Sequence, residues 1–411
     1  MKEPKYTVVV PTRERADTLL HSLRTCVTQE YDNLTILVSD NCSQDNTEEV
    51  VRSFNDPRIQ YVNTGKRLSM SHNWEFALSH VKEGYVTFLG DDDGLLPDAV
   101  RDVNDLFNET GLQAVNMNPA PDFYFWPSYF NKKQANMLKI SFQSGFVIKQ
   151  GKEVLQKVLR CREDYLPLPF VYSSFVSMTA IDPIKRKTGA FFRSQIPDVY
   201  SGIALANQVG PYVHSKKRLR ISGASSHSTG MSQFNYNANK KAMDQFASEP
   251  NIPFHPALQY CPSYTYLMAE SFQQSFDAGL NPDEKAAFDW MPFIETAIKE
   301  ANTKFHSQRD NILNVTRYIA ETNHLDREHV EKLINASTSR LNNIIPYDLK
   351  RYSYPFLLID ASTYGVKNIF DACQLHRTIY DNPGRYWLKS TTWKDMFRMV
   401  FGELADRYTS A

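Results

Sequence analysis

The sequence contains no apolar stretch that approaches the roughly 20 residues needed for a membrane-spanning helix. Its N-terminal segment, MKEPKYTVVVPTRER, has no apolar core of a secretory signal, so we expect a cytoplasmic protein. The five cysteines are scattered and include no Cys-x-x-Cys pair, which is typical of reduced thiols in a reducing compartment.

The sequence also lacks an excess of charge of either sign. Lysine plus arginine and aspartate plus glutamate each number 46, so the formal net charge is zero. This balance argues against nucleic acid as a partner bound by bulk charge. The patterns GxGxxG, HExxH and GxSxG and the P-loop pattern are absent, which leaves dehydrogenase, metalloprotease, α/β-hydrolase and ATPase functions without support.

What the first part of the chain does contain is an alternation of strand and helix patterns. We expect strands at Tyr6–Val10, Leu34–Val38, Arg58–Val62 and Tyr85–Leu89, and helices at Asp17–Gln29, Thr47–Phe54, Ser69–Val81 and Ala99–Phe107. Further on, we expect a helix at Val199–Asn207, a strand at Val213–Arg220 and a loop over the Ser-, Gly- and Asn-rich segment 222–239. This spacing predicts an α/β fold with a mostly parallel, doubly wound sheet.

Helical patterns replace strand patterns after residue 240. They cover segments 265–279, 283–304, 309–322 and 326–344. A chain of 411 residues is also long enough for two domains at roughly 150 residues each. We therefore predict one domain over residues 1–240 and a mostly α-helical C-terminal domain over residues 241–411.

Three adjacent aspartates, Asp91, Asp92 and Asp93, follow the expected strand Tyr85–Leu89. Like charges this close repel one another, and a hard divalent cation such as Mg²⁺ or Mn²⁺ is a common reason for such a cluster. The alternative is a solvated acidic turn that leads into a helix capped by Asp98. A second acid at the end of an expected strand, Asp40, favours the metal, because ligands of such sheets bind at the carboxyl ends of strands.

Three segments, VVVPTRERADTL, ILVSDNCSQDNTEEVV and NWEFALSHVKEGYVTFLGDDDGLLPDAV, carry a family resemblance. In order and spacing they resemble the nucleotide-sugar-binding half of inverting family 2 glycosyltransferases. The resemblance is strong over residues 5–110 and weak over 111–235. It implies the GT-A fold, a Rossmann-like mixed sheet, in the first domain.

The resemblance also implies roles for residues that bind the donor and its metal. The turn Pro11, Thr12 and Arg13 would line the nucleotide pocket, and Asp40 would accept hydrogen bonds from uracil. Asp92 would be the principal ligand of Mn²⁺ or Mg²⁺. The first acid of the usual Asp-x-Asp pattern is replaced here by Gly90, so Asp91 would face the ribose or share the metal, and Asp93 competes with it for that role.

Two further binding roles are weighed on the same basis. His227, in the expected loop, would complete the metal sphere, although a loop histidine is more often solvated. Lys66 and Arg67, which precede the helix Ser69–Val81, would meet the diphosphate, although a solvated turn is the plainer explanation.

Inverting sugar transfer needs a general base to accept the proton of the attacking hydroxyl. The family places this base at the start of a helix in the second half of the domain, and Asp198, which follows Pro197 and precedes the helix Val199–Asn207, matches that context. The alternative is that Asp198 only caps the helix. Asp164 and Asp182 are weaker candidates because neither opens a clear helix.

The implied function is metal-dependent transfer of a sugar from a UDP-sugar to a glycan or lipid-linked saccharide. The helical domain could shape the acceptor site, form a homo-oligomer or touch a membrane. Segment 386–404 has an aromatic helical face that suits a peripheral membrane contact at the inner face of the membrane, although docking onto the fold is favoured. Two alternatives stay open: a sugar nucleotidyltransferase, and an inactive GT-A scaffold that binds nucleotide or glycan.

Overall fold

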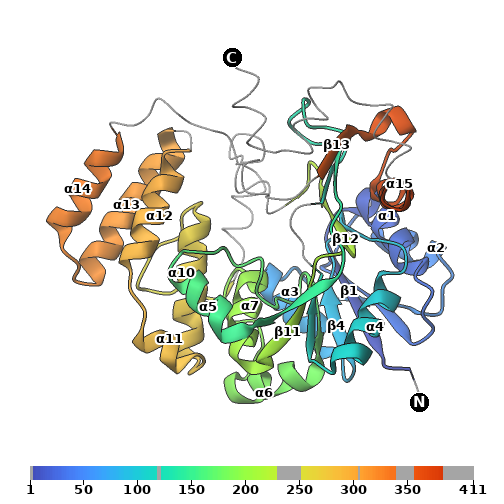
Figure 1. The fold of residues 1–411 in the computed structure, drawn as a ribbon, viewed down its shortest axis with the longest axis horizontal. Coiled ribbons are helices and arrows are strands. Elements are labelled where there is room, and N and C mark those ends of the chain that lie inside the picture. Colours follow the sequence, from blue (N-terminus) through green and yellow to red (C-terminus); the bar gives the residue numbers. More distant parts are fainter. Residues whose placement is uncertain (1–2, 118–121, 229–250, 304–305, 339–355, 383–411) are drawn as a thin grey trace.

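The computed structural model describes residues 3–117, 122–228, 251–303, 306–338 and 356–382. An eight-stranded mixed sheet occupies the first part of the chain, in the order β3-β2-β1-β4-β10-β6-β11-β9 (Figure 1). Its strands are β1 (Tyr6–Thr12), β2 (Leu34–Asp40), β3 (Ile59–Asn63), β4 (Tyr85–Phe88), β6 (Ala114–Asn116), β9 (Phe146–Gln150), β10 (Ser174–Ser177) and β11 (Pro211–Ser215).

Strands β1 to β4 are parallel, because β1 pairs with β2 and β4, and β2 pairs with β3, all in parallel register. Strand β10 runs antiparallel to both β4 and β6, and β9 runs antiparallel to β11. The carboxyl ends of β1 to β4 and the start of β10 therefore share one edge of the sheet.

Helices cover both faces of this sheet, as the alternation of side chains along each strand requires. Residues such as Val8 and Ile36 face a core that includes α1 (Ala16–Val27), α2 (Thr47–Ser53) and α4 (Ala99–Thr110). Their neighbours Val9 and Leu37 face the opposite core, which includes α3 (Met70–Ser79), α6 (Met178–Thr188) and α7 (Pro197–Val209).

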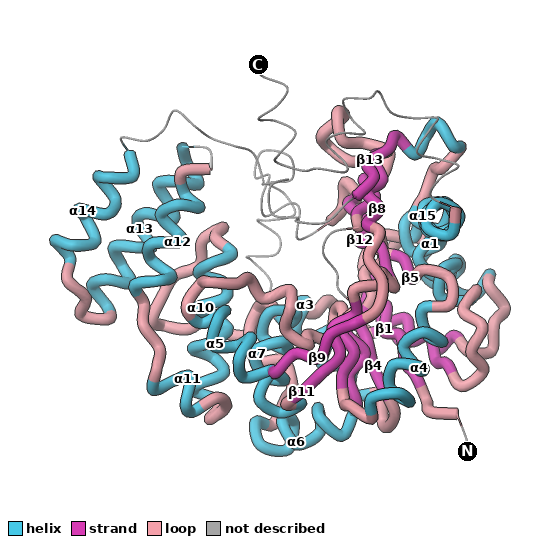
Figure 2. The backbone as a smooth tube through the Cα atoms, viewed as in Figure 1, coloured by secondary structure: helices cyan, strands magenta, loops and turns pink. Residues whose placement is uncertain are grey.

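A second, five-stranded sheet stands beside the main one, in the order β13-β8-β7-β12-β5 (Figure 2). Its strands are β5 (Gly94–Leu95), β7 (Phe123–Phe125), β8 (Met137–Ser141), β12 (Arg220–Ala224) and β13 (Phe356–Asp360). The short helix η2 (Ala361–Tyr364) and helix α15 (Ile369–Asp381) follow β13, and α15 packs against α1, β5 and β12.

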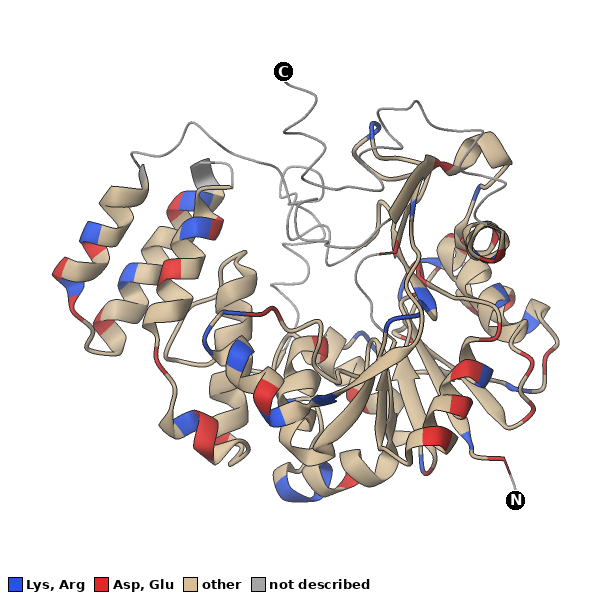
Figure 3. Ribbon diagram, in the orientation of Figure 1, with Lys and Arg blue, Asp and Glu red and all other residues tan. Residues whose placement is uncertain are grey.

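A helical layer lies on the other side of the molecule. It consists of α10 (Tyr264–Asp277), α11 (Pro282–Ala286), α12 (Met291–Ala301), α13 (His306–Thr322) and α14 (Arg327–Thr338). Its apolar core continues into α5 (Gly151–Leu159) and α7. Figure 3 shows basic and acidic positions interspersed along α12 to α14, as in the exposed pair Arg317–Glu331.

The structure confirms the predicted fold class, a mixed α/β sheet followed by a mostly helical region. Three expected elements are wrong. The strand expected at Val213–Arg220 is two strands, β11 and β12, which belong to different sheets, and β12 extends into the expected loop. The helix expected over 283–304 is the pair α11 and α12, and a strand, β13, occurs in the part expected to be helical.

The domain boundary at residue 240 lies outside the described residues and stays a prediction. Residues from both sides of it share one apolar core, since Val154 and Ile203 cluster with Phe272 and Phe293. The segment 386–404 also lies outside the described residues. Within the part of the chain that the structure describes, no helix combines the length and the hydropathy needed to cross a bilayer.

A buried polar network ties α15 to the second sheet. Nε2 of His376 lies 2.7 Å from Oδ2 of Asp122, and Arg218 Nε lies 3.4 Å from Asp122 Oδ1. Asp122 also accepts the Ser141 backbone N–H at 3.1 Å. Burial would raise the pKa of Asp122, but His376 and Arg218 outweigh it and hold that pKa below its ordinary value.

We predict that His376→Ala lowers the free energy of unfolding by about 3 kcal/mol, because it removes a buried charge-assisted partner. The urea midpoint, followed by circular dichroism, measures this, and Glu328→Ala at the exposed Lys332–Glu328 pair is the control that leaves the midpoint unchanged. Equal midpoints for both variants would contradict the prediction.

The lowered pKa of Asp122 stabilises the fold above about pH 4, its ordinary pKa, and this stabilisation is lost as pH falls through the folded value.

Candidate active site

The carboxyl ends of three parallel strands bring polar side chains into register at one edge of the main sheet. Thr12 of β1 pairs with Asp40 of β2, and Asp40 pairs with Asn63 of β3. Pro11 precedes Thr12 and pairs with Ser39. The loop after β4 reaches the same edge, because the Thr12 hydroxyl donates to Oδ2 of Asp91 at 2.8 Å.

The carboxylate of Asp40 is almost fully buried and accepts three hydrogen bonds from the described residues. The Ser43 backbone N–H donates to Oδ1 at 2.9 Å, and the Tyr61 hydroxyl and the Asn63 amide donate to Oδ2 at 2.6 and 3.0 Å. An ionised carboxylate offers about four acceptor positions. One position therefore remains for a further donor.

Asp93 is committed to a buried structural network. Its Oδ2 pairs with Nη2 of Arg220 and accepts the Tyr172 hydroxyl at 2.6 Å, while Oδ1 accepts the Gly223 backbone N–H at 2.7 Å. The side chains of Asp93 and Arg220 are at most 2% exposed. Asp93 is therefore engaged within this network, and which of Asp91 and Asp93 would assist Asp92 stays a prediction.

Asp91 is neutralised from another side. Nη1 of Arg15 lies 2.8 Å from its Oδ1, and Thr12 occupies its Oδ2. Burial raises the pKa of Asp91, the Arg15 guanidinium opposes this shift, and the neighbouring charge of Asp92 adds to it.

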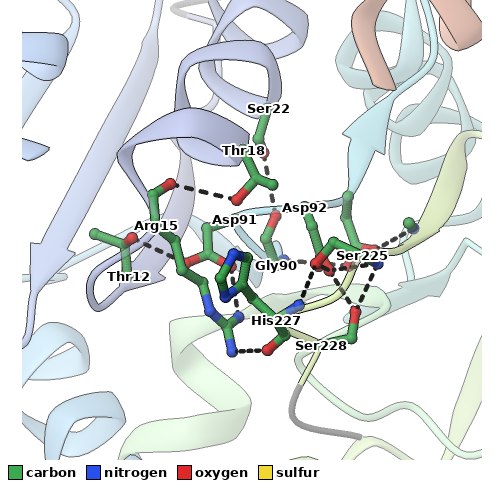
Figure 4. Close-up of polar contacts among 12 residues, drawn as sticks. Thr12, Arg15, Thr18, Ser22, Gly90, Asp91, Asp92, Ser225, His227 and Ser228 are labelled. Atoms are coloured by element: carbon green, nitrogen blue, oxygen red, sulfur yellow. Dashed lines mark hydrogen bonds and ion pairs between the residues drawn. The ribbon is translucent and has the colours of Figure 1, made fainter. Parts of the chain in front are cut away.

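Asp92 differs from its neighbours because it has no cationic partner among the described residues. Its Oδ2 accepts the Ser225 hydroxyl at 2.7 Å, the Ser225 backbone N–H at 3.3 Å and the Ser228 hydroxyl. Figure 4 shows both serines converging on this carboxylate from the segment after β12. The indole N–H of Trp126 donates to the Asp92 carbonyl at 3.0 Å, which fixes the backbone of the loop.

The repulsion within the aspartate triplet is thus relieved in a way that the sequence did not indicate. Two guanidinium groups, those of Arg15 and Arg220, pair with Asp91 and Asp93. The arginines thus offset part of the charge for which the sequence suggested a metal ion, and the metal itself stays a prediction. The remaining unpaired carboxylate, Asp92, is the one to which the resemblance assigns the metal.

His227 lies in the same segment, between the two serines. Its carbonyl accepts Nη2 of Arg15 and its backbone N–H donates to the Ser225 hydroxyl at 3.2 Å. Figure 4 shows the contact of the His227 carbonyl with Arg15, and the residue is exposed. The backbone of His227 therefore lies at the aspartate loop, and the metal role of its side chain stays a prediction.

Asp198 occupies the first turn of α7, directly after Pro197. The cap position is Ile196, whose side chain makes no capping hydrogen bond, and the Tyr165 hydroxyl donates to Asp198 Oδ2 at 3.3 Å. Burial raises the pKa of Asp198, although the N–H groups of Val199 and of Asp198 itself and the Tyr165 hydroxyl oppose this shift. A carboxylate with a raised pKa is a stronger base.

A short chain of contacts joins Asp198 to the aspartate loop. The Ser201 hydroxyl donates to the Asp198 carbonyl at 2.7 Å and accepts the Val171 backbone N–H at 3.2 Å. The carbonyl of Val171 accepts the Phe88 N–H at the end of β4, and the next residue, Tyr172, binds Asp93. The start of α7 and the aspartate loop therefore border the same edge of the sheet.

The remaining predicted residues lie on the periphery of this edge. Arg67 is exposed and pairs with Glu14, and Lys66 is exposed on the turn after β3. Arg13 is half-buried at the end of β1. The structure places them near the turn that follows β1, and their contact with a diphosphate stays a prediction.

The oxygen atoms around Asp92 suit a hard divalent cation. The described residues contain no group of three or more His, Cys, Asp or Glu side chains arranged to hold a metal. Mg²⁺ is commonly held by one or two carboxylates together with substrate phosphates, so such a group is not required. Asp92, Asp91 and the Ser225 and Ser228 hydroxyls supply the oxygen atoms of the type that Mg²⁺ and Mn²⁺ prefer.

Sequence analysis missed Arg15, Tyr172, Arg220, Ser225 and Ser228. Only Arg15 carried a local signal, since it belongs to the same PTRER turn as Thr12 and Arg13. The others approach the loop from elements 79–136 residues away in the chain.

Comparisons with known proteins concern mainly the first part of the chain. Residues 7–173 match the family model described as Glycosyl transferase family 2. A Campylobacter jejuni protein named GalNAc(5)-diNAcBac-PP-undecaprenol beta-1,3-glucosyltransferase is 35% identical over 109 residues, which are 26% of this chain and 35% of that protein. The succinoglycan biosynthesis protein ExoO of Rhizobium meliloti is 25% identical over 112 residues, 27% of this chain and 32% of its own length. The chain thus spans about a third of each of these relatives.

Among solved structures, residues 1–349 of S. aureus TarS in complex with UDP-GlcNAc align with a TM-score of 0.44 and 12% sequence identity. The alignment covers 82% of this chain and 92% of that chain.

We predict that Asp93→Ala lowers the free energy of unfolding by about 3–5 kcal/mol, because it leaves the buried Arg220 guanidinium without its carboxylate. Asp92→Ala removes only hydroxyl and amide partners and should unfold at a clearly higher urea concentration than Asp93→Ala. Parallel urea titrations measure both variants. The same loss in both would contradict the assignment of Asp93 to the structural network.

We predict that Gly223→Ala disrupts the aspartate loop. A Cβ at this position would lie 1.7 Å from the Asp92 carbonyl oxygen and 2.8 Å from Nε1 of Trp126, so the backbone must move. Binding of UDP in the presence of Mn²⁺, measured by calorimetry, should weaken at least tenfold. Ser222→Ala, one residue earlier on the same strand, is the control, and equal affinity in the two variants would show that the loop tolerates the shift.

Proposed function

Because residues 7–173 match the model of glycosyl transferase family 2, we propose that this chain is an inverting, metal-dependent glycosyltransferase. It transfers a sugar from a UDP-sugar to a hydroxyl of a glycan or lipid-linked saccharide. The observation that carries the proposal is the aspartate loop, where arginines neutralise Asp91 and Asp93 and leave Asp92 unpaired among the described residues at the edge that also bears Asp40.

The nucleotide binds across the ends of β1 and β2. Asp40 accepts the uracil N–H at its remaining acceptor position, while Tyr61 and Asn63 hold the carboxylate in place. Pro11, Thr12 and Arg13 line the pocket beside it.

The diphosphate binds over the aspartate loop. Asp92 and Asp91, with His227 as a further ligand, would hold a divalent cation, which would supply positive charge against the charge of the leaving diphosphate. The guanidinium of Arg15, held by Asp91 and the His227 carbonyl, also stabilises the negative charge of the diphosphate. Lys66 and Arg67 contact the phosphates from the neighbouring turn.

Asp198 acts as the general base. As the acceptor oxygen forms its bond to the anomeric carbon, Asp198 accepts the hydroxyl proton, and the bond between that carbon and the diphosphate oxygen breaks on the opposite face of the sugar. This single displacement inverts the anomeric configuration. The raised pKa of Asp198 makes its carboxylate a stronger base, which favours acceptance of the hydroxyl proton.

The acceptor belongs to glycan assembly. The Campylobacter relative is named for glucosyl transfer to an undecaprenol-linked saccharide, and the Rhizobium relative for succinoglycan biosynthesis. A lipid-linked acceptor brings the enzyme to a membrane surface. Residues 241–411 then serve as a second domain that shapes the acceptor side.

We predict that Asp198→Asn retains UDP-sugar affinity within about twofold but loses transfer by at least a hundredfold, because the amide cannot accept the proton. In the wild-type chain, transfer falls as pH drops through the pKa of Asp198, which lies above the ordinary value of about 4. Product formation from a panel of UDP-sugars and calorimetric donor binding measure the two effects.

Asp92→Ala is the complementary variant. It should lose the Mn²⁺ dependence of donor binding along with transfer, whereas Asp198→Asn keeps that dependence. Near-normal transfer by Asp198→Asn would place the base elsewhere, and binding without turnover in the wild-type chain would support the inactive-scaffold alternative.

A further inference from the structure

A fully buried carboxylate in the helical layer contacts the loop that leads to Asp198. Glu270 of α10 accepts the Ser194 hydroxyl at Oε2, and its Oε1 accepts Nε2 of Gln274 at 2.7 Å and the His255 backbone N–H at 3.4 Å. Among the described residues, no cation lies within ion-pair distance of Glu270. Burial raises its pKa to about 7, although these three donors oppose the shift.

The partner of Glu270, Ser194, organises the loop between α6 and α7. Its hydroxyl also accepts the backbone N–H of Ile196 at 3.2 Å, two residues before Asp198. Its carbonyl accepts the Ser71 hydroxyl of α3 at 2.6 Å. Ser194 thus connects α10 of the helical layer, the loop between α6 and α7, and helix α3.

A second carboxylate contacts the same loop. Glu75 of α3 accepts the backbone N–H groups of Phe191 and Phe192 at 2.8 and 3.0 Å, and it pairs with Lys185 at 3.3 Å. The segment that ends in Asp198 is therefore fixed by one carboxylate from the α/β part of the chain and one from the helical part.

We propose that Glu270 is a positioning residue that sets the start of α7, and with it Asp198, from the helical layer. The inference rests on the proposed role of Asp198 as the base. It gives residues beyond 240 a defined part in the reaction, since the bond between Glu270 and Ser194 links the two parts of the chain directly before the catalytic turn. A buried carboxyl with a strongly shifted pKa and no ion partner is unfavourable for stability, and such groups are concentrated at functional sites.

Donor binding should not depend on this contact, because the proposed nucleotide and diphosphate residues lie on β1, β2, the turn after β3, the aspartate loop and the segment after β12. Loss of the contact should therefore lower kcat without weakening the binding of the UDP-sugar. Glu270→Ala should lower kcat about tenfold to a hundredfold, as expected for a misplaced catalytic group, and leave the UDP-sugar Kd within twofold. Glu270→Gln keeps an oxygen acceptor for the Ser194 hydroxyl, so this variant should retain most of the wild-type kcat.

Glu300→Ala is the matched control. Glu300 is a carboxylate of the same helical layer that accepts the hydroxyls of Ser263 and Thr265 at 2.7 and 3.0 Å at the start of α10. If Glu270 only stabilised the helical layer, the two alanine variants would affect kcat alike. Unchanged kcat in a folded Glu270→Ala variant, or an equal loss in both variants, would overturn the proposal.

A second measurement does not require turnover. Hydrogen–deuterium exchange of the peptide over residues 189–199 should accelerate in Glu270→Ala, and it should stay at the wild-type rate in Glu300→Ala and close to it in Glu270→Gln. Unchanged exchange in Glu270→Ala contradicts the positioning role. Faster exchange together with full activity of Asp198→Asn would instead show that Glu270 holds the loop but that Asp198 is not the base.

Discussion

The buried ion pair between Asp93 and Arg220 is the contact on which the candidate site depends. It joins the loop after β4, in the main sheet, to β12 in the second sheet, and Tyr172 and Gly223 complete the hydrogen bonds of the carboxylate. Removing two charges from water is unfavourable unless their remaining polar atoms are satisfied, and here they largely are. The pair holds the loop in one conformation, and the position of Asp92 follows from it.

The rest of the site is assembled around that loop from distant parts of the chain. Arg15 after β1 neutralises Asp91, the segment after β12 supplies the hydroxyls that hold Asp92, and the strand register places Asp40 at the same edge. Helix α15 packs on α1 and β5, where a side chain at Gly94 would meet Cys373 Sγ at 2.6 Å. Residues near both ends of the described chain therefore help to hold the loop that carries the three aspartates.

The sequence was sufficient for elements that depend on local pattern and insufficient for contacts between them. The alternation of apolar side chains predicted β1 to β4 and α1 to α4, and the end of β2 placed Asp40 correctly, because parallel strands share an edge. Arg220 could not be assigned to Asp93, since nothing local indicates that the strand ending in a basic residue divides at 216–219 and that its second half joins another sheet. Likewise, β13 follows a long helical pattern and owes its conformation to pairing with β8, over 200 residues earlier in the chain.

The central claim is that Asp92 is available to a cation that arrives with a uridine nucleotide. The most direct test is the melting temperature of the full chain with UDP, GDP and CMP, each with and without Mn²⁺, because a ligand that binds only the folded state raises it. The account predicts a rise with UDP that requires Mn²⁺ and is absent in Asp92→Ala. A rise with UDP of equal size without the metal, or no rise with any nucleotide, would contradict it.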